Sequence, residues 1–299
     1  MQKTILVTGA GGLLGREILN QLCSLNSYNV FALTSNRSKL SKLFSNEPNI
    51  KILGHEELDN KQVPFNEIDV VMHCAFARSN NGYELAESLN FSQRIFTESI
   101  KSNCSIINIS SRSVYGQNPN TPWMETTKVE PNSLYALAKY SSEIMLQGIV
   151  ESYNNRGYTN IRLAGLISPE ISDRVVNKFI DSTLKGKSIC IIGGKQQFAY
   201  LDARDAASGI IFLLQAAPQT WQPIYNLGHL KSYSIKEIAE AVAKVAGKFN
   251  CPEVKINIEK TDEALYAEMD STLFYTDTNW QPNYDMDMIV ESIFADKLQ

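Results

Sequence analysis

Histidine and cysteine are scarce in this 299-residue sequence, and their spacing argues against a metal centre. The three histidines lie far apart, and no two cysteines form a CxxC pair, so we predict no zinc site. The cysteines are odd in number, widely spaced and mostly within apolar stretches, which indicates reduced thiols rather than disulfides. They are Cys23, Cys74, Cys104, Cys190 and Cys251.

Strong charge and long apolar runs are also lacking. The formal net charge of −4 provides no general field for DNA or RNA, so we expect no nucleic-acid partner. No apolar run is long enough to span a bilayer, and the chain enters its first predicted strand without a signal peptide, so we expect a cytoplasmic protein without a membrane partner. The hydrophobic content of 43% indicates a globular protein with one large core or two lobes.

The stretch TGAGGLLG, residues 8–15, has the pattern of a phosphate-binding turn. An apolar run precedes it, and from Arg16 to Leu25 apolar residues recur at helical spacing. Glycine allows a sharp turn and a close approach to a ligand, and the amides at a helix N-terminus face a diphosphate. A glycine cluster alone is more often a plain turn, but the flanking strand and helix indicate a dinucleotide site. The predicted cofactor contacts here are Gly9, Gly12, Leu13, Leu14 and Gly15.

Short runs rich in valine and isoleucine alternate with helix-length segments in the first half of the chain. Strands are predicted at residues 5–7, 29–34, 49–53, 69–74, 105–110 and 160–164, and a helix at 134–153. This alternation predicts an α/β fold, a Rossmann-type doubly wound parallel sheet. We assign residues 1–166 to a dinucleotide-binding Rossmann domain, with returning segments from about 195–228.

Residues 167–299 are predicted to form mainly a smaller C-terminal α/β lobe that binds the substrate. Helices are expected at 175–184 and 205–214, and a strand at 188–192. Ser234 and Glu237 form a capping box for a further helix, which runs to Gly247. Since ligands of open α/β sheets bind beyond the carboxyl ends of the strands, we expect the site in a cleft between sheet and lobe.

The end of the second predicted strand indicates which dinucleotide is bound. An acidic residue there takes the ribose hydroxyls of NAD, whereas small polar residues with an arginine accommodate the 2′-phosphate of NADP. The sequence has Thr34, Ser35, Asn36 and Arg37, with no carboxylate, which favours NADP and leaves NAD possible. The alternative is a solvated turn whose arginine has no ligand.

A candidate acid/base pair follows from the spacing of Tyr135 and Lys139. Four residues apart on a helix, the two side chains point to one face. An adjacent ammonium lowers the pKa of a phenol, so the tyrosine can exchange a proton with a substrate oxygen during hydride transfer. Ser110 and Ser111, at the end of the fifth predicted strand, add hydroxyls near the same place. Chance occurrence on a surface helix is the alternative explanation.

Together these motifs resemble the extended short-chain dehydrogenase/reductase family, in its NAD-dependent epimerase/dehydratase branch. The resemblance also rests on the segments DVVMHCA (69–75), SSRSVYG (110–116), DARD (202–205), YNLG (225–228) and WQP (280–282). It implies Ser111, Tyr135 and Lys139 as catalytic triad, with Tyr135 and Lys139 also in contact with the cofactor, where Lys139 would hold the nicotinamide ribose. It further implies that Asn90 supports the lysine through water, that Ala75 and Phe76 line the cofactor, and that Ser110 lies beside it.

The sequence departs from this family where the substrate would bind. Sugar-nucleotide dehydratases carry an Asp-Glu pair where Arg112 and Ser113 stand here, so dehydration is disfavoured. Relatives that bind a nucleotide diphosphate often have an asparagine and an arginine where this chain has Gly165 and Phe198. The aspartate that commonly follows the third strand is missing as well. Substrate contacts would then come from other charged residues, namely Arg78, Arg174 and Lys195. The alternatives are that these three are surface residues without a ligand, or that the substrate is not a conventional nucleotide sugar.

We therefore expect an NAD(P)-dependent sugar epimerase or keto-sugar reductase, with a nucleotide sugar as small-molecule substrate. A reductase of a small carbonyl compound without a nucleotide is one alternative, and a non-catalytic dinucleotide-sensing protein is another. Relatives often form dimers, and Ile144, Ile149 and Val150 on the tyrosine helix are available either for a homodimer contact or for the core.

Overall fold

The computed structural model describes residues 2–25, 27–153, 157–259, 261 and 265–298, and the chain divides into two compact units. The first comprises residues 1–116, 129–163 and 207–225, and the second comprises 117–128, 164–206 and 226–299. Compared with the predicted domain bounds, the second unit also takes residues 117–128 and 164–166, and the segment that returns to the first is shorter, at 207–225.

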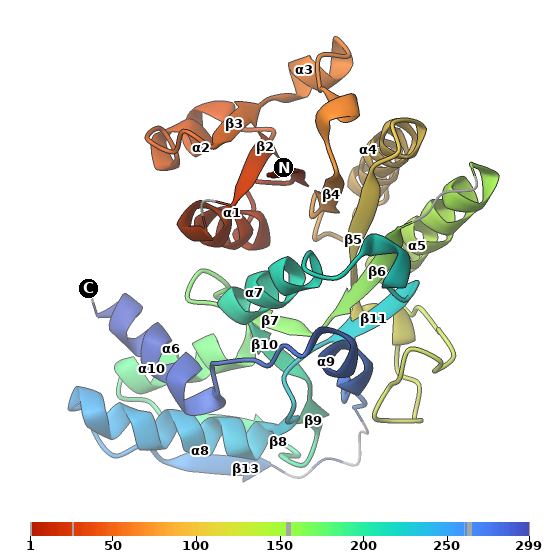
Figure 1. Cartoon of the computed structure of the whole chain (residues 1–299). Helices are drawn as coiled ribbons and strands as arrows, with labels where there is room; N and C mark the ends of the chain where they lie inside the picture. Colours follow the sequence, from red (N-terminus) through yellow and green to blue (C-terminus); the bar gives the residue numbers. More distant parts are fainter. Residues whose placement is uncertain (1, 26, 154–156, 260, 262–264, 299) are drawn as a thin grey trace. The chain divides into compact units, whose positions relative to one another are not determined.

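A seven-stranded sheet in the order β11-β6-β5-β4-β1-β2-β3 organises the first unit (Figure 1). Strands β1 to β6 pair in parallel, which confirms the predicted doubly wound fold. Because β2 and β4 flank β1 on opposite sides, the strand order reverses direction beside β1. The strands are β1 (Lys3–Thr8), β2 (Tyr28–Leu33), β3 (Ile50–Leu53), β4 (Val70–His73), β5 (Ser105–Ser111), β6 (Tyr158–Leu163) and β11 (Ile224–Leu227).

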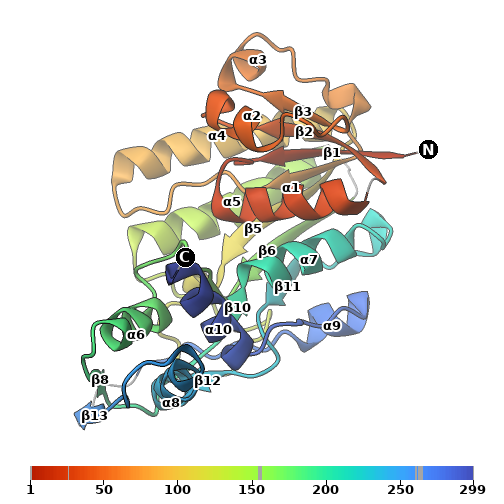
Figure 2. The same ribbon diagram turned by 90° about the vertical axis from the view of Figure 1, so that its left-hand side faces the viewer.

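Helices cover both faces of this sheet, with α4 and α5 on one face and α1 and α7 on the other (Figure 2). The face under α4 and α5 includes a core of fully buried side chains, among them Ile95, Phe96, Ile106 and Leu146. The helical segments are α1 (Leu13–Leu25), α2 (Arg37–Leu43), α3 (His55–Asp59), η1 (Phe65–Glu67), α4 (Gly82–Lys101), η2 (Arg112–Tyr115), α5 (Leu134–Ser152), α7 (Ala203–Leu213) and η3 (Pro218–Thr220).

The second unit packs three helices around its own core, in which Ile180, Val242 and Val290 are fully buried. Its helical segments are α6 (Val175–Leu184), α8 (Ile235–Ala246), η4 (Gly247–Phe249), α9 (Thr272–Thr278) and α10 (Met286–Lys297). Three strand pairs accompany them: β7 (Gly165–Ile167) with β10 (Tyr200–Asp202), β8 (Ile189–Ile192) with β13 (Ile256–Glu259), and β9 (Gln197–Phe198) with β12 (Tyr233–Ser234).

Side-chain hydrogen bonds explain two sequence landmarks of the second unit. The predicted capping box of Ser234 and Glu237 is present at the start of α8. Gly247 ends that helix in right-handed conformation, and the chain turns left-handed three residues later, at Asn250.

Asp205, which is 1% exposed, accepts the backbone N–H groups of Asn283 and Tyr284. The DARD segment (202–205) therefore anchors the chain that follows WQP (280–282).

The turn between β1 and α1 depends on close backbone packing. Gly9 has a φ of +63°, and a Cβ there would lie 2.7 Å from the backbone of Ala75, the second residue after β4. A Cβ on Gly15 would collide with the Gly9 carbonyl and lie 2.8 Å from the Cα of Ala10. The turn therefore sits directly against the segment that follows β4.

We expect the Gly15→Ala substitution to destabilise the protein by about 1–3 kcal/mol, because the added methyl group has no space and must displace the turn. Gly148→Ala is the matched control. Gly148 lies inside α5 with no atom within 4 Å of its Cβ position, so alanine there should stabilise by up to about 1 kcal/mol. Urea unfolding of both variants measures the difference, and equal stabilities would contradict the packing argument.

Candidate active site

A cavity of about 740 Å³ opens at the carboxyl ends of β1, β2 and β4, where the strand order reverses. This is the position at which open α/β sheets bind nucleotides. The segments that line it are the glycine turn, the end of β2 and the residues after it, one face of α2, both ends of α3, the segment after β4 and one face of α4. Of the predicted cofactor residues, those that line the cavity are Gly9, Gly12, Thr34, Ser35, Asn36, Ala75, Phe76 and Asn90.

The glycine turn is shaped to hold a flat backbone surface toward this cavity. A Cβ at Gly11 would lie 2.8 Å from the Thr34 hydroxyl, so a larger residue would fill the space between the turn and β2. Arg16 braces the turn by donating from Nη1 to the Gly11 carbonyl at 2.8 Å. These features fit the diphosphate of a dinucleotide, which needs close backbone approach and nearby positive charge.

Seven residues predicted to contact the cofactor are not among those that line the cavity: Leu13, Leu14, Gly15, Arg37, Ser110, Tyr135 and Lys139. Gly15 packs against the backbone of the turn, and Leu14 is 8% exposed in the core. The Ser110 hydroxyl donates to the Glu143 carboxylate within the protein interior. As cofactor contacts these seven stay predictions.

Arg37 is engaged by a neighbouring carboxylate. It begins α2, for which Asn36 is the N-cap, and its Nη1 lies 2.5 Å from Oε1 of Glu57. Glu57 is itself fixed, because it accepts the Gly54 N–H at 2.9 Å. Backbone hydrogen bonds, and after them Arg37, hold the pKa of Glu57 below its usual value. The Arg37 guanidinium, on which the prediction of NADP partly rested, is therefore already paired with the carboxylate of Glu57.

The sequence reasoning missed several residues that line the cavity. Lys39, Arg94, His55 and Phe91 all contribute, and the rings of His55 and Phe91 stack with centroids 5.3 Å apart. An aromatic pair of this kind offers a flat surface to a base. The available signal was the segment at residues 55–57, directly after the third strand, where the aspartate common in the family is missing.

Lys139 is 4% exposed and makes two close contacts. Its Nζ donates to the Ile109 carbonyl of β5 at 2.7 Å and lies 4.0 Å from the centroid of the Phe76 ring. Burial lowers the pKa of Lys139 to about 7, and Cys74 and Glu143 oppose that shift. The lysine thus changes charge near neutral pH.

Tyr135 stands one helical turn before Lys139, in the first turn of α5. Its ring packs edge to face against Phe76, with centroids 6.4 Å apart, so Phe76 connects the tyrosine, the lysine and the cavity. The Tyr135 N–H donates to Oδ1 of Asn80 at 3.2 Å. Helix geometry thus places the predicted acid/base pair on one face.

Ser111 ends β5 and is the N-cap of η2. Its hydroxyl oxygen accepts the N–H of Ser113 at 3.2 Å and the Ser113 hydroxyl at 2.9 Å. With its oxygen occupied by these donors, the Ser111 proton is free to be donated to a substrate oxygen. Ser111 lies two residues after Ile109, whose carbonyl binds Lys139, so the structure brings all three predicted catalytic residues to one region.

Gly165 and Phe198, which stand where relatives that bind a nucleotide diphosphate often have an asparagine and an arginine, lie in the second unit. A Cβ at Gly165 would lie 3.1 Å from the Tyr200 ring, and that ring stacks on Phe198 with centroids 5.7 Å apart. The aromatic pair therefore leaves little space for an asparagine side chain at position 165. Of the charges considered as substitutes, Arg174 donates from Nε to the Leu166 carbonyl at 2.9 Å.

Membrane-spanning helices and metal-binding clusters are both missing from the described part of the chain. No described helix is both long and apolar enough to cross a membrane. The described residues also include no group of three or more histidine, cysteine, aspartate or glutamate side chains arranged to hold a metal ion.

Known proteins include both sequence relatives and solved structures that are similar to this chain. A trifunctional UDP-glucose 4,6-dehydratase/UDP-4-keto-6-deoxy-D-glucose 3,5-epimerase/UDP-4-keto-L-rhamnose-reductase of Arabidopsis thaliana is 25% identical over 82% of the chain, which spans about 40% of that relative's length. A probable UDP-arabinose 4-epimerase of rice is 26% identical over 94% of the chain and 78% of the relative.

The solved structure of UDP-N-acetylglucosamine 4-epimerase from Bacillus cereus has the same fold, with a TM-score of 0.81, 20% identity, and coverage of 99% of this chain and 100% of that one. The model of the NAD dependent epimerase/dehydratase family matches residues 5–228, which include the glycine turn, the cavity and the three predicted catalytic residues. The chain is thus a member of the NAD dependent epimerase/dehydratase family.

Proposed function

We propose that this chain is an NAD(P)-dependent oxidoreductase that acts on a nucleotide-activated sugar, as a keto-sugar reductase or an epimerase. The observation that carries the proposal is the position of Phe76, which lines the dinucleotide cavity and packs against both Lys139 and Tyr135. The acid/base pair therefore adjoins the cofactor cavity. Relatives named for reactions of UDP-sugars support a sugar substrate.

Each of the three residues has a distinct role in this reaction. A bound nicotinamide would supply the hydride acceptor or donor. Tyr135 exchanges the proton with the reacting substrate oxygen, and the Lys139 ammonium on the same helix face lowers the pKa of the tyrosine. Ser111 donates its hydroxyl proton to the same oxygen, because its own oxygen is already hydrogen-bonded to Ser113. Asn90, which lines the cavity, supports the lysine through water.

The residues after Ser111 favour reduction or epimerisation over dehydration. Elimination of water needs a second acid and base beside the hydroxyl residue. Arg112 and Ser113 occupy those positions, and Ser113 is hydrogen-bonded to Ser111. We therefore do not propose a dehydratase.

For the cofactor we propose NADP(H), with NAD(H) as the alternative. The end of β2 lines the cavity with Thr34, Ser35 and Asn36, which carry no negative charge, and Lys39 adds a cation to the same wall. A 2′-phosphate would meet donors there rather than a carboxylate. Because Arg37 is paired with Glu57, we expect a smaller difference between the affinities for NADP(H) and NAD(H) than a free arginine would give.

A second candidate function is the reduction of a small carbonyl compound that carries no nucleotide. The specific observation in its favour is the filled space at Gly165, the residue expected to replace the asparagine of nucleotide-binding relatives, because the Tyr200 ring lies 3.1 Å from its Cβ position. Activity with simple carbonyl compounds, but not with keto-sugar nucleotides, would distinguish the two.

We also propose a homodimer through the outer face of α5. Of the three apolar residues predicted to be available, Val150 is buried in the core, Ile149 packs partly against it, and Ile144 is 52% exposed. Leu137 on the same helix is 53% exposed, so an apolar strip faces outward.

Replacing Tyr135 by phenylalanine should lower kcat by at least about 100-fold, because the substrate oxygen loses its proton donor. NADPH binding, measured by fluorescence titration, should stay within about twofold, since the ring and its packing against Phe76 are kept. Tyr140→Phe is the control on the same helix. Parental turnover by the Tyr135→Phe variant would show that the mechanism is wrong.

The parent protein should bind NADPH more tightly than NADH. In the Glu57→Gln variant the affinity for NADPH should rise about two- to fivefold, which is what a partly exposed surface ion pair contributes, because Arg37 becomes available to the phosphate. Affinity for NADH should not change, and the neighbouring Glu56→Gln variant should resemble the parent. Tighter binding of NADH by the parent, or a full complement of NAD(H) released on denaturation, would contradict the NADP proposal.

Replacing Ile144 by glutamate should convert a dimer to a monomer, because a charge is then placed in an apolar contact. Light scattering coupled to gel filtration measures the mass. Met288→Glu, at an exposed apolar position on α10, is the control and should leave the mass unchanged. A monomeric parent would refute the dimer.

A further inference from the structure

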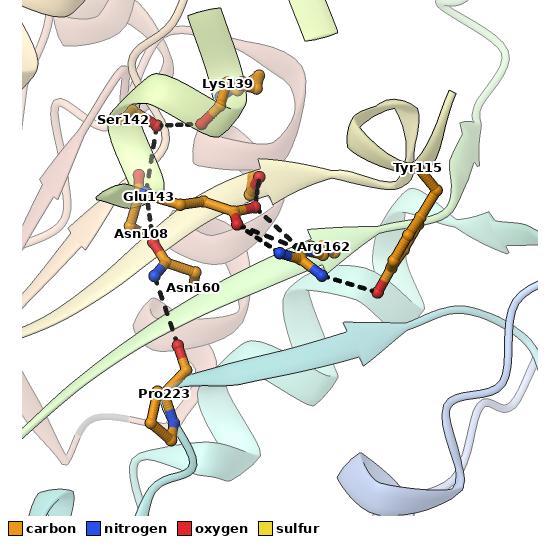
Figure 3. Close-up of polar contacts among 9 residues, drawn as sticks. Asn108, Tyr115, Lys139, Ser142, Glu143, Asn160, Arg162 and Pro223 are labelled. Atoms are coloured by element: carbon orange, nitrogen blue, oxygen red, sulfur yellow. Dashed lines mark hydrogen bonds and ion pairs between the residues drawn. The ribbon is translucent and has the colours of Figure 1, made fainter. Parts of the chain in front are cut away.

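A buried ion pair joins β6 to α5, the helix that carries Tyr135 and Lys139. Arg162 of β6 and Glu143 of α5 are 2% and 4% exposed, and Arg162 donates from Nη2 to Oε2 of Glu143 at 2.7 Å and from Nε to Oε1 at 3.1 Å. Figure 3 shows the guanidinium between the Glu143 carboxylate and the Tyr115 hydroxyl, which it reaches at 3.0 Å. Burying two charges is costly unless every polar atom is bonded, and here further partners are supplied.

The further partners stand on both sides of Ser111. The Ser110 hydroxyl donates to Glu143, and Tyr115, the last residue of η2, accepts from Arg162. Ser111 lies between them and is the N-cap of η2. The chain is therefore held by the ion pair immediately before Ser111 and four residues after it.

The same ion pair also holds the helix of the acid/base residues. Tyr135, Lys139 and Glu143 follow one another at intervals of four, so they lie along one face of α5. Lys139 donates a hydrogen bond to the carbonyl of Ile109, and Glu143 accepts one from the hydroxyl of Ser110. Helix α5 is therefore hydrogen-bonded to two consecutive residues of β5.

A second polar chain runs beside the first (Figure 3). The Ser142 hydroxyl donates to the Lys139 carbonyl at 2.8 Å, and Nδ2 of Asn108 reaches Ser142 at 3.4 Å and Oδ1 of Asn160 at 2.8 Å. Asn160 continues to the Pro223 carbonyl. The contact of α5 with β5 and β6 is thus fixed by directional bonds on top of apolar packing.

We propose that the Glu143–Arg162 pair is a positioning device that holds the Ser111 hydroxyl at a fixed place relative to Tyr135 and Lys139. The inference rests on the proposed function, since it assumes the roles given there to these three residues. Glu143 and Arg162 act through others and do not touch the substrate.

Glu143 has a second, electrostatic effect. The ionisable groups near Lys139 are His73 within β4, Cys74 directly after that strand, and Tyr135 and Glu143 on its own helix. Burial lowers the pKa of His73 to about 3 and raises that of Cys74 to about 12, so both are neutral at pH 7. Cys74 and, after it, Glu143 raise the pKa of Lys139 against burial. Without Glu143, Lys139 would lose its proton at a lower pH.

The test compares three variants of the full-length protein. Glu143→Gln keeps the shape but removes the charge, Tyr115→Phe removes one hydrogen bond to Arg162, and Glu151→Gln is the control on the exposed side of α5. The first readout is the titration of the Lys139 side chain by NMR of 13C-labelled lysine, assigned with a Lys139→Arg variant. The second is kcat and KM with NADPH and UDP-4-keto-6-deoxy-D-glucose.

We expect Glu143→Gln to lower the Lys139 titration midpoint and to reduce kcat by about 10- to 100-fold, as misplaced catalytic groups do, with KM within about threefold. Tyr115→Phe should leave the midpoint unchanged and reduce kcat by about fivefold, the effect of one lost hydrogen bond. Glu151→Gln should match the parent in every measurement. Tyr115→Phe keeps the ring against Arg162, so it tests the proposal even where Glu143→Gln folds poorly.

The proposal is wrong if Tyr115→Phe keeps the parental kcat, or if Glu143→Gln changes neither the midpoint nor kcat. Failure of the proposed function looks different, because a parent that is inactive with keto-sugar nucleotides, or an active Tyr135→Phe variant, would refute the assigned chemistry. The Lys139 midpoint would in that event still decide whether Glu143 controls the charge of the lysine.

Discussion

Lys139 and Arg162 are both almost fully buried, and a buried positive charge must be compensated within the protein. One carboxylate, Glu143, contributes to this for both cations: it pairs directly with Arg162, and, after Cys74, it raises the pKa of Lys139 against burial. The helix that carries it must therefore lie where the carboxylate reaches β6 and the lysine reaches β5. The position of α5 that compensates the buried charges is thus the same position that places the acid/base pair beside the sheet.

Backbone packing sets the other boundary of the site. Gly9 lies so close to Ala75 that the turn after β1 and the segment after β4 act as one surface, and Phe76 follows directly on that surface. Thr8 and His73 strengthen the contact with a buried hydrogen bond of 2.9 Å. Since Phe76 packs on Lys139 and Tyr135, the cavity and the candidate catalytic residues share a wall.

Local patterns in the sequence predicted much of the fold. Strands of a parallel sheet are short apolar runs, so their positions were found within about two residues, and α6 was predicted residue for residue at Val175–Leu184. The glycine turn and the Tyr135–Lys139 spacing were visible for the same reason. Pairings such as Arg37 with Glu57 or Ser110 with Glu143 join residues 20 and 33 positions apart, and tertiary packing decides them. The spacing of Glu143 four residues after Lys139 was a signal, but its partner Arg162 lies on another strand.

The chain passes between the two units at residues 116/117, 128/129, 163/164, 206/207 and 225/226. The first unit is therefore not a contiguous stretch of sequence, and its sheet lacks the edge strand β11 until residues 224–227 exist. During synthesis β6 remains an uncovered edge while more than sixty further residues emerge from the ribosome. Completion of the nucleotide-binding sheet is thus tied to the synthesis of part of the second unit, and no simple truncation separates the two.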